Sequence, residues 1–182
     1  MPSRAWKYEH RGEAWWQGET LSVAIGQGPL VATPLQVARM ISSIFTGYLV
    51  KPRILESETI EQEPLAIQPE TLAFLKESME EAVISGTGQR ARTKDMKIYA
   101  KTSTAQVSDL SKRNQDKRHL EHGWFVAHVT YKQEKPFTLV IVAEHAGSSM
   151  VSVDIAKKFL MGYKREIDAE YKKKTAMQNV VV

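Results

Sequence analysis

Cysteine is absent from this 182-residue chain, and so are long apolar runs. The lack of cysteine excludes disulfides, thiolate catalysis, Cys-ligated zinc and iron–sulfur clusters, although it does not fix the cellular compartment. The longest nearly apolar run covers residues 137–143, far short of the ~20 residues of a membrane span. Residues 1–7 lack the apolar core of a secretory signal, so neither an exporting nor an anchoring segment is predicted within the chain.

A strong excess of one charge is also missing. Lysine and arginine number 25 against 21 aspartates and glutamates, which leaves a formal net charge of +4. This mild basicity does not favour nucleic acid, because the basic residues of 112–118 are diluted by acids and have no interleaved aromatics. The five histidines lack metal-ligand spacing, His119 and His122 being a weak pair at best, so no metal or other cofactor is predicted.

The first half of the chain carries two helix signals after an irregular start. Residues 1–20 contain four aromatic residues without a clear period and are predicted to form an extended loop. Pro34 at a first helical position predicts a helix that Gly47 ends. An acidic, exposed connector is predicted over residues 56–64. A second helix, with apolar residues at helical spacing, is predicted from Pro69 to Ile84.

The second half changes to strand patterning. Strands are predicted over residues 97–107, 124–131 and 137–144, and the short turn between the last two favours an antiparallel pair. A last helix is expected over residues 151–163, followed by a frayed or disordered tail over 164–182. The fold class expected for this chain is α+β.

Lys101-Thr102-Ser103-Thr104 lies on the first predicted strand and is the one motif that carries chemistry. An ammonium group beside two hydroxyls makes a recogniser of carboxylates, and an edge-strand amide can bind an oxyanion. Spacing alone does not separate this interpretation from an ordinary exposed strand face with polar residues.

The surroundings of this motif are more specific. Several segments follow one another in a fixed order along the chain: Pro2-Ser3-Arg4-Ala5-Trp6-Lys7, Trp16-Gln17-Gly18-Glu19-Thr20, Ile25-Gly26-Gln27-Gly28, Thr33-Pro34-Leu35-Gln36-Val37-Ala38, Gly86-Thr87, Lys101-Thr102-Ser103-Thr104-Ala105-Gln106-Val107 and His122-Gly123-Trp124-Phe125. In this order they resemble the C-terminal part of class B penicillin-binding proteins, nearest to the rod-elongation type. The resemblance covers residues 2–163.

The resemblance implies a fold and a domain organisation. It implies the C-terminal portion of the penicillin-binding-protein transpeptidase fold, which is shared with serine β-lactamases and has an antiparallel sheet flanked by helices. Residues 1–182 would then form the C-terminal part of a single transpeptidase domain. Residues 1–96 would be mostly loops and helices, 97–163 would hold three strands and the last helix, and 164–182 would be a tail. The strand at residues 137–144 would expose an unpaired apolar edge.

The resemblance also implies an activity. Members of the family cross-link peptidoglycan: a serine attacks the D-Ala-D-Ala stem peptide, releases D-alanine and passes the acyl group to an amine. The implied catalytic residues are Lys101, as a positive charge, and Thr104, whose backbone N–H would donate to the oxyanion. Thr102, Ser103 and Thr104 would form the substrate-binding groove, with Thr102 and Thr104 holding the terminal carboxylate.

The family's other two motifs, Ser-x-x-Lys and Ser-x-Asn, do not occur in the sequence. Without the nucleophile this chain alone is expected to be inactive. Ser103 stands where the family has glycine, and its side chain would crowd the groove beside Lys101. Ser103 could itself be the nucleophile with Lys101 as base, but such pairs need a desolvated lysine, and nothing in the sequence predicts burial of Lys101.

Two functions therefore stay open. One is part of a D,D-transpeptidase that binds penicillin, and the other is a non-catalytic peptidoglycan-binding or scaffold fragment. The implied partners are stem peptides ending in D-Ala-D-Ala, β-lactams, and the membrane glycosyltransferase and scaffold of the elongation machinery. The implied location of the parent protein is the periplasmic face of the inner membrane.

Overall fold

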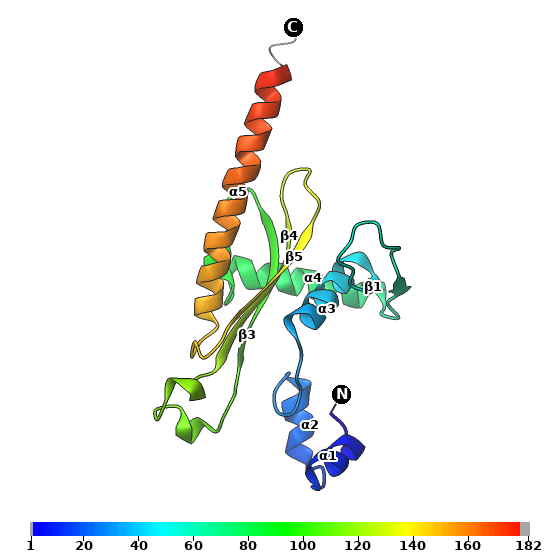
Figure 1. The fold of residues 1–182 in the computed structure, drawn as a ribbon, viewed down its shortest axis with the longest axis vertical. Helices are drawn as coiled ribbons and strands as arrows, with labels where there is room; N and C mark the ends of the chain where they lie inside the picture. The colour runs from blue at the N-terminus through cyan, green and yellow to red at the C-terminus, as the bar shows by residue number, and fades with distance from the viewer. Residues whose placement is uncertain (1, 179–182) are drawn as a thin grey trace. The chain divides into compact units, whose positions relative to one another are not determined.

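The computed structural model describes residues 2–178, which divide into two compact units, residues 2–33 and 34–178 (Figure 1). Each unit is described by itself. No helix within the described residues is both long and apolar enough to cross a membrane. The sheet that carries the Lys101 motif belongs to the second unit.

The first unit contains two short helices, α1 (Arg4–Arg11) and α2 (Gln17–Ala24), where an extended loop was predicted. That prediction was wrong because local caps, not hydrophobic periodicity, define these helices. The Ser3 hydroxyl accepts from the Trp6 N–H at the start of α1, and Gly12 ends it at φ +67°. At the start of α2 the Glu19 carboxylate accepts from the Trp16 N–H at 3.0 Å.

A buried ion pair joins the two helices of this unit. Lys7, 4% exposed, contacts the carboxylate of Glu19 at 2.8 Å and that of Glu13 at 3.3 Å. The hydrogen bond that Lys7 donates to the Glu19 carboxylate raises the pKa of Lys7. Burial acts against ionisation of Glu19, but hydrogen bonds from Lys7 and Trp16 hold the pKa of its carboxyl below its usual value. Both groups therefore stay charged over the neutral range.

The second unit begins with α3 (Pro34–Thr46), which starts at the predicted proline and ends before Gly47 at φ +77°. Strand β1 (Tyr48–Val50) pairs antiparallel with β2 (Gln62–Pro64). The prediction of a connector over residues 56–64 is therefore wrong for its last three residues, which form β2. A three-residue pairing across a loop has no local signature in the sequence. Helix α4 (Pro69–Ile84) has the predicted bounds.

Three strands form the central sheet: β3 (Lys97–Ala105), β4 (His122–Thr130) and β5 (Phe137–Ala143). Their order is β3-β4-β5 and both pairs are antiparallel, which confirms the prediction within two residues at each strand end. Both β3 and β5 are therefore edge strands of the sheet within residues 2–178. Three short 3-10 turns, η1 (Gln89–Ala91), η2 (Leu110–Lys112) and η3 (Lys117–His119), interrupt the connecting loops.

Each face of the sheet carries its own core. On one face α5 (Met150–Gln178) and the end of α4 cover the sheet. This first core comprises Val83, Ala91, Ile98, Ala100, Phe125, Ala127, Val129, Val153, Ala156 and Leu160. On the other face α3 and α4 pack around Ile41, Met79 and Val126. Alternation of side chains along β3 and β4 supplies both cores, as expected for a sheet covered on two sides.

Helix α5 is longer than predicted. It runs to Gln178, whereas the sequence predicted a helix end at Tyr163 and a frayed or disordered tail over 164–182. Residues 179–182 lie outside the described part of the chain. The added turns are held by contacts with the sheet: Asp168 accepts from the Tyr131 hydroxyl at 2.6 Å, and Ile167 is buried. These contacts are non-local, so periodicity within the segment does not reveal them.

Candidate functional site

The Lys101 motif, residues 101–104, occupies the C-terminal half of β3, which is an edge strand. Its side chains alternate between the two faces of the sheet. Thr102 is 6% exposed and continues the inward row of Ile98 and Ala100. Lys101 and Ser103 lie on the other face and are exposed. The motif therefore does not present its four side chains on one surface.

Thr102 is anchored to the loop after α4. Its Oγ1 lies 2.6 Å from Oγ1 of Thr87, and either hydroxyl can be the donor. Gly86, just before Thr87, packs so closely on α4 that a Cβ there would lie 2.9 Å from Cα of Ala82. The structure thus brings the Gly86-Thr87 segment into contact with the Lys101–Thr104 segment. The two bonded threonines are 15 residues apart in the sequence.

Lys101 remains close to its own backbone. Its Nζ donates to the Thr102 carbonyl at 2.6 Å, and its side chain is exposed. A lysine base for Ser103 would need to be desolvated, and this exposure gives no such environment. The geometry therefore does not favour the Ser103–Lys101 nucleophile, while it leaves the ammonium beside the strand as a charge for an anionic ligand.

Thr104 lies where β3, β4 and the start of α5 converge. Its Oγ1 accepts from the Ser149 N–H at 3.3 Å, just before α5 begins. Opposite Thr104 on β4 is Gly123, where a Cβ would lie 2.4 Å from the Ser148 carbonyl oxygen. The fully buried Ser152 donates to the Gly123 carbonyl at 2.7 Å. Only glycine at position 123 permits this close approach, which fixes the position of Thr104.

Two histidines near this corner form a contact that the sequence analysis missed. The His145 N–H donates to Nδ1 of His122 at 2.9 Å, and their rings are 4.7 Å apart. His122 therefore pairs with the turn after β5 and not with His119. His145 lies in the turn that follows β5, at φ +52°. Because the contact spans 23 residues, no local pattern could have revealed it.

The site thus combines an exposed ammonium, hydroxyls at the end of an edge strand, and an unpaired strand edge. An edge strand offers backbone groups to an extended peptide, and the ammonium and hydroxyls offer donors to a carboxylate. This arrangement can bind an extended peptide that ends in a carboxylate.

Comparison with known proteins gives a consistent result. The sequence profile of the penicillin binding protein transpeptidase domain matches residues 4–161. A peptidoglycan D,D-transpeptidase MrdA from Haemophilus influenzae is 31% identical, and the match covers 90% of this chain and 28% of the relative. The Acinetobacter baumannii protein of the same name is 33% identical, with 81% of this chain and 25% of the relative covered. This chain thus spans less than a third of the length of these relatives.

Comparison with solved structures also finds penicillin-binding proteins. The structure of the penicillin-binding protein PBP2 from Helicobacter pylori in complex with MreC matches 90% of this chain and 30% of its own, with 30% identity and a TM-score of 0.73. The structure of Pseudomonas aeruginosa PBP2 in complex with WCK 5153 matches 89% of this chain and 36% of its own, with 25% identity and a TM-score of 0.65. The α+β fold expected from the sequence is confirmed by these matches.

Proposed function

This chain belongs to the penicillin-binding-protein transpeptidase family, and from that premise we propose that it supplies the substrate-binding strand of a peptidoglycan D,D-transpeptidase. The observation that carries the proposal is the position of Lys101–Thr104 on an edge strand, with Thr102 bonded to Thr87. A stem peptide ending in D-Ala-D-Ala is an extended chain with a terminal carboxylate, which is the chemistry that this strand can recognise.

In this proposal each residue of the motif has a role. The Lys101 ammonium provides positive charge near the substrate carboxylate. The Thr102 and Thr104 hydroxyls hold that carboxylate, and the backbone N–H of Thr104 stabilises the oxyanion of the tetrahedral intermediate. Ser103 lies beside Lys101, on the face of the strand opposite to the Thr102 and Thr104 side chains.

The covalent step needs a serine nucleophile, and the Lys101–Thr104 motif does not provide one. In the proposed reaction the serine oxygen bonds to the carbonyl carbon of the penultimate D-alanine, and the peptide bond breaks with D-alanine as leaving group. An amine of a second stem peptide then takes the acyl group and frees the serine. Neither Ser-x-x-Lys nor Ser-x-Asn occurs in these 182 residues, so we propose that the nucleophile lies in chain beyond them.

The proposed partners follow from the same family. They are stem peptides, β-lactams as mimics of D-Ala-D-Ala, and the membrane glycosyltransferase of the elongation machinery, with no nucleic acid among them. The related Helicobacter pylori protein was solved in complex with MreC, which supports a scaffold partner for this chain as well. The proposed location is the periplasmic face of the inner membrane.

The alternative is a non-catalytic peptidoglycan-binding or scaffold fragment. The absence of both serine motifs from the sequence favours it for the chain taken alone. The same Lys101–Thr102 groove would then bind a stem peptide without acylation.

Labelling with a fluorescent penicillin separates the two functions. The native protein, expressed from its full reading frame, is expected to form a covalent adduct that survives denaturation, and Lys101→Ala is expected to slow labelling about tenfold or more. Thr175→Ala, on an exposed part of α5, should label normally. Absence of any adduct, together with binding of purified stem peptides, would establish the non-catalytic function.

A further inference from the structure

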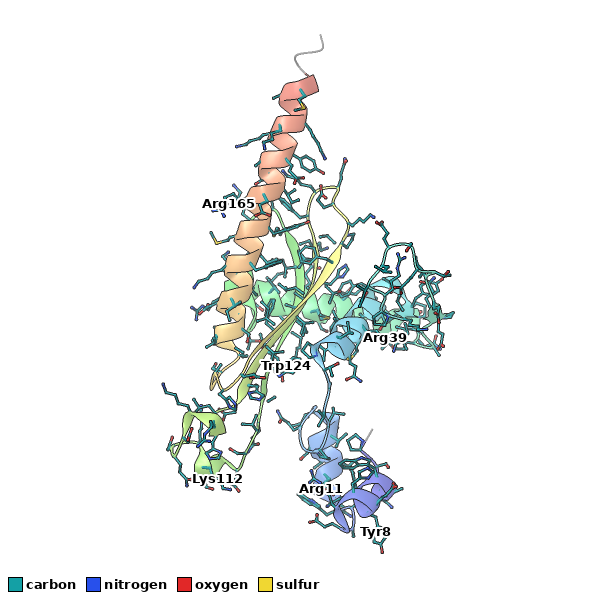
Figure 2. The ribbon with its side chains drawn as sticks, in the orientation of Figure 1. Tyr8, Arg11, Arg39, Lys112, Trp124 and Arg165 are labelled. Carbon is teal, nitrogen blue, oxygen red and sulfur yellow. The ribbon has the colours of Figure 1, made fainter. Side chains whose placement is uncertain are left out.

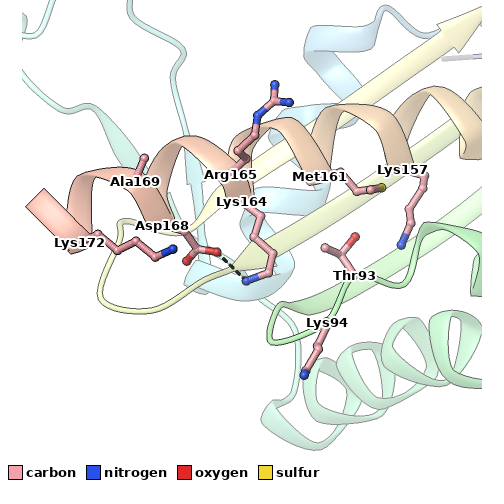
Figure 3. A pocket seen from close by; sticks show the side chains of 9 residues that line it. All are labelled: Thr93, Lys94, Lys157, Met161, Lys164, Arg165, Asp168, Ala169 and Lys172. Atoms are coloured by element: carbon pink, nitrogen blue, oxygen red, sulfur yellow. Dashed lines mark hydrogen bonds and ion pairs between the residues drawn. The ribbon is translucent and has the colours of Figure 1, made fainter.

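The outer half of α5 carries a basic groove that has no part in the proposed transpeptidase site. The groove has a volume of about 600 Å³ and lies between α5 and the loop that precedes β3 (Figure 3). Five basic side chains and one carboxylate line it, namely Lys94, Lys157, Lys164, Arg165, Lys172 and Asp168. Most of these residues lie beyond residue 161, where the family match ends.

The one carboxylate of the groove is already neutralised from inside the protein. Asp168 accepts from Lys164 at 2.9 Å and from the Tyr131 hydroxyl at 2.6 Å, and it also contacts Lys132. Figure 3 shows Asp168 turned toward Lys164 along the helix. Its negative charge is therefore not available to offset the other lysines of the groove.

Within residues 2–178, the other basic side chains of the groove form no ion pair with a carboxylate. Lys157 donates to the Arg92 carbonyl, which holds its ammonium at the base of the groove. Among residues 2–178, no carboxylate pairs with Lys94 or Lys172, and both side chains are exposed. Arg165 lies on the outer side of α5 with its guanidinium directed away from Lys94 (Figure 3). The groove thus has an excess of positive side-chain charge, carried by Lys94, Lys157, Arg165 and Lys172.

The shape and lining of the groove favour one class of anion. Its floor is formed by Thr93, Met161, Ala169 and the methylene stems of the lysines, and it contains no aromatic ring for stacking a nucleic-acid base. A bilayer surface is flat and is bound by an apolar helix face, not by a recess between a helix and a loop. A polypeptide can enter such a recess, place carboxylates beside the ammonium groups and contact the apolar floor.

We propose that this groove on α5 binds an acidic peptide segment of a protein partner. Glutamate and aspartate side chains of the partner would lie beside Lys94, Lys157 and Lys172, and its apolar atoms would contact Met161. The inference does not depend on the transpeptidase proposal, because no residue of the groove belongs to the Lys101 motif.

The test uses the native protein, expressed from its full reading frame, and a fluorescein-labelled peptide of alternating glutamate and alanine, with fluorescence anisotropy as the readout. The double variant Lys94→Gln/Lys172→Gln should bind about tenfold more weakly, because two exposed ammonium groups that would contact the peptide carboxylates are lost. Ala169→Glu, which adds a carboxylate to the floor without removing a lysine, should weaken binding in the same direction. Binding should also fall as sodium chloride rises from about 50 to about 500 mM.

The matched control is Lys112→Gln/Lys117→Gln, which removes the same charge from the loop between β3 and β4. Figure 2 shows Lys112 well apart from Arg165 on α5. The control should retain binding within about twofold. Equal losses in both double variants would show that the attraction is only net charge, and would overturn the proposal. Tighter binding to anionic phosphatidylglycerol vesicles or to single-stranded DNA than to the peptide, lost in the same variants, would also overturn it in favour of that ligand.

Discussion

Oγ1 of Thr87 and Oγ1 of Thr102 lie 2.6 Å apart, and this bond ties the end of α4 to the strand of the proposed site. Thr102 is nearly fully buried, so loss of its partner leaves a hydroxyl without a hydrogen bond in the interior. Thr87→Val is therefore expected to reduce the free energy of unfolding by about 1–3 kcal/mol. Urea denaturation followed by circular dichroism measures the change.

A double-mutant cycle makes this prediction specific. Thr87→Val/Thr102→Val removes both hydroxyls and should cost less than the sum of the single variants, because neither partner is then left unsatisfied. Thr175→Val, at an exposed hydroxyl on α5, serves as the control and should change stability little. Strict additivity of the two substitutions would contradict a direct bond.

Substitution of glycine by alanine is expected to have opposite effects on stability at positions 123 and 162. A Cβ on Gly123 would lie 2.4 Å from a backbone carbonyl oxygen, so Gly123→Ala should destabilise the fold by about 1–3 kcal/mol. Gly162 lies within α5 with open space around it, so Gly162→Ala should stabilise by about 0.5–1 kcal/mol. Thermal melts of both variants would show the two signs, and equal effects would refute the packing argument.

Acid stability should depend on Asp168. Hydrogen bonds from Lys132, Tyr131 and Lys164 hold the pKa of its carboxyl well below the usual value. A carboxyl whose pKa is lowered by folding stabilises the fold above its unfolded pKa of about 3.9, and this contribution is lost as the pH falls through the folded pKa. The wild-type urea midpoint should therefore drop below about pH 4.

Asp168→Asn should lose part of that acid dependence and be less stable than wild type at neutral pH. Urea midpoints between about pH 2 and pH 7 test both expectations. Asp154 also lies on α5 and forms an ion pair with Arg90 of η1. Asp154→Asn therefore controls for the general loss of a carboxylate on this helix. An unchanged acid slope in Asp168→Asn would show that other carboxyls govern it.

Ser103 is expected to limit access to the proposed groove. It lies on the exposed face of β3 with Lys101, where a side chain narrows the approach of a ligand to the strand. In the native protein, Ser103→Gly should therefore accelerate acylation by a labelled penicillin about severalfold. Ser111→Gly in the following loop is the control. An unchanged acylation rate in Ser103→Gly would show that the Ser103 side chain does not restrict access of the ligand to the strand.

The free edge of β5 should make the isolated chain poorly soluble or dependent on a partner. The strand is apolar and only half-buried, and it has no neighbour beyond β4 within residues 2–178. We expect concentration-dependent association in light scattering, reduced by Val142→Lys on the edge strand. Val151→Lys, on an exposed part of α5, adds the same charge and should not reduce it. A monomeric chain with a cooperative melt at high temperature would contradict the prediction.

Local signals in the sequence were sufficient for several elements. A proline and a helical period define α4 over Pro69–Ile84, and Pro34 and Gly47 bracket α3. Alternation and β-branched residues place the three strands within two residues of their ends. Where the signal was a side-chain cap without a long period, as with Ser3 and Gly12 around α1, the sequence analysis predicted a loop.

The sequence by itself determined the family, the order of the motifs and the absence of both serine motifs, because these depend only on residue identity. Tertiary structure alone decided which side chains meet. The Thr87–Thr102 bond and the His122–His145 contact join residues far apart in the chain, and the extension of α5 depends on Asp168 reaching Tyr131. Such contacts arise when the chain folds back on itself, so patterns within a short segment do not predict them.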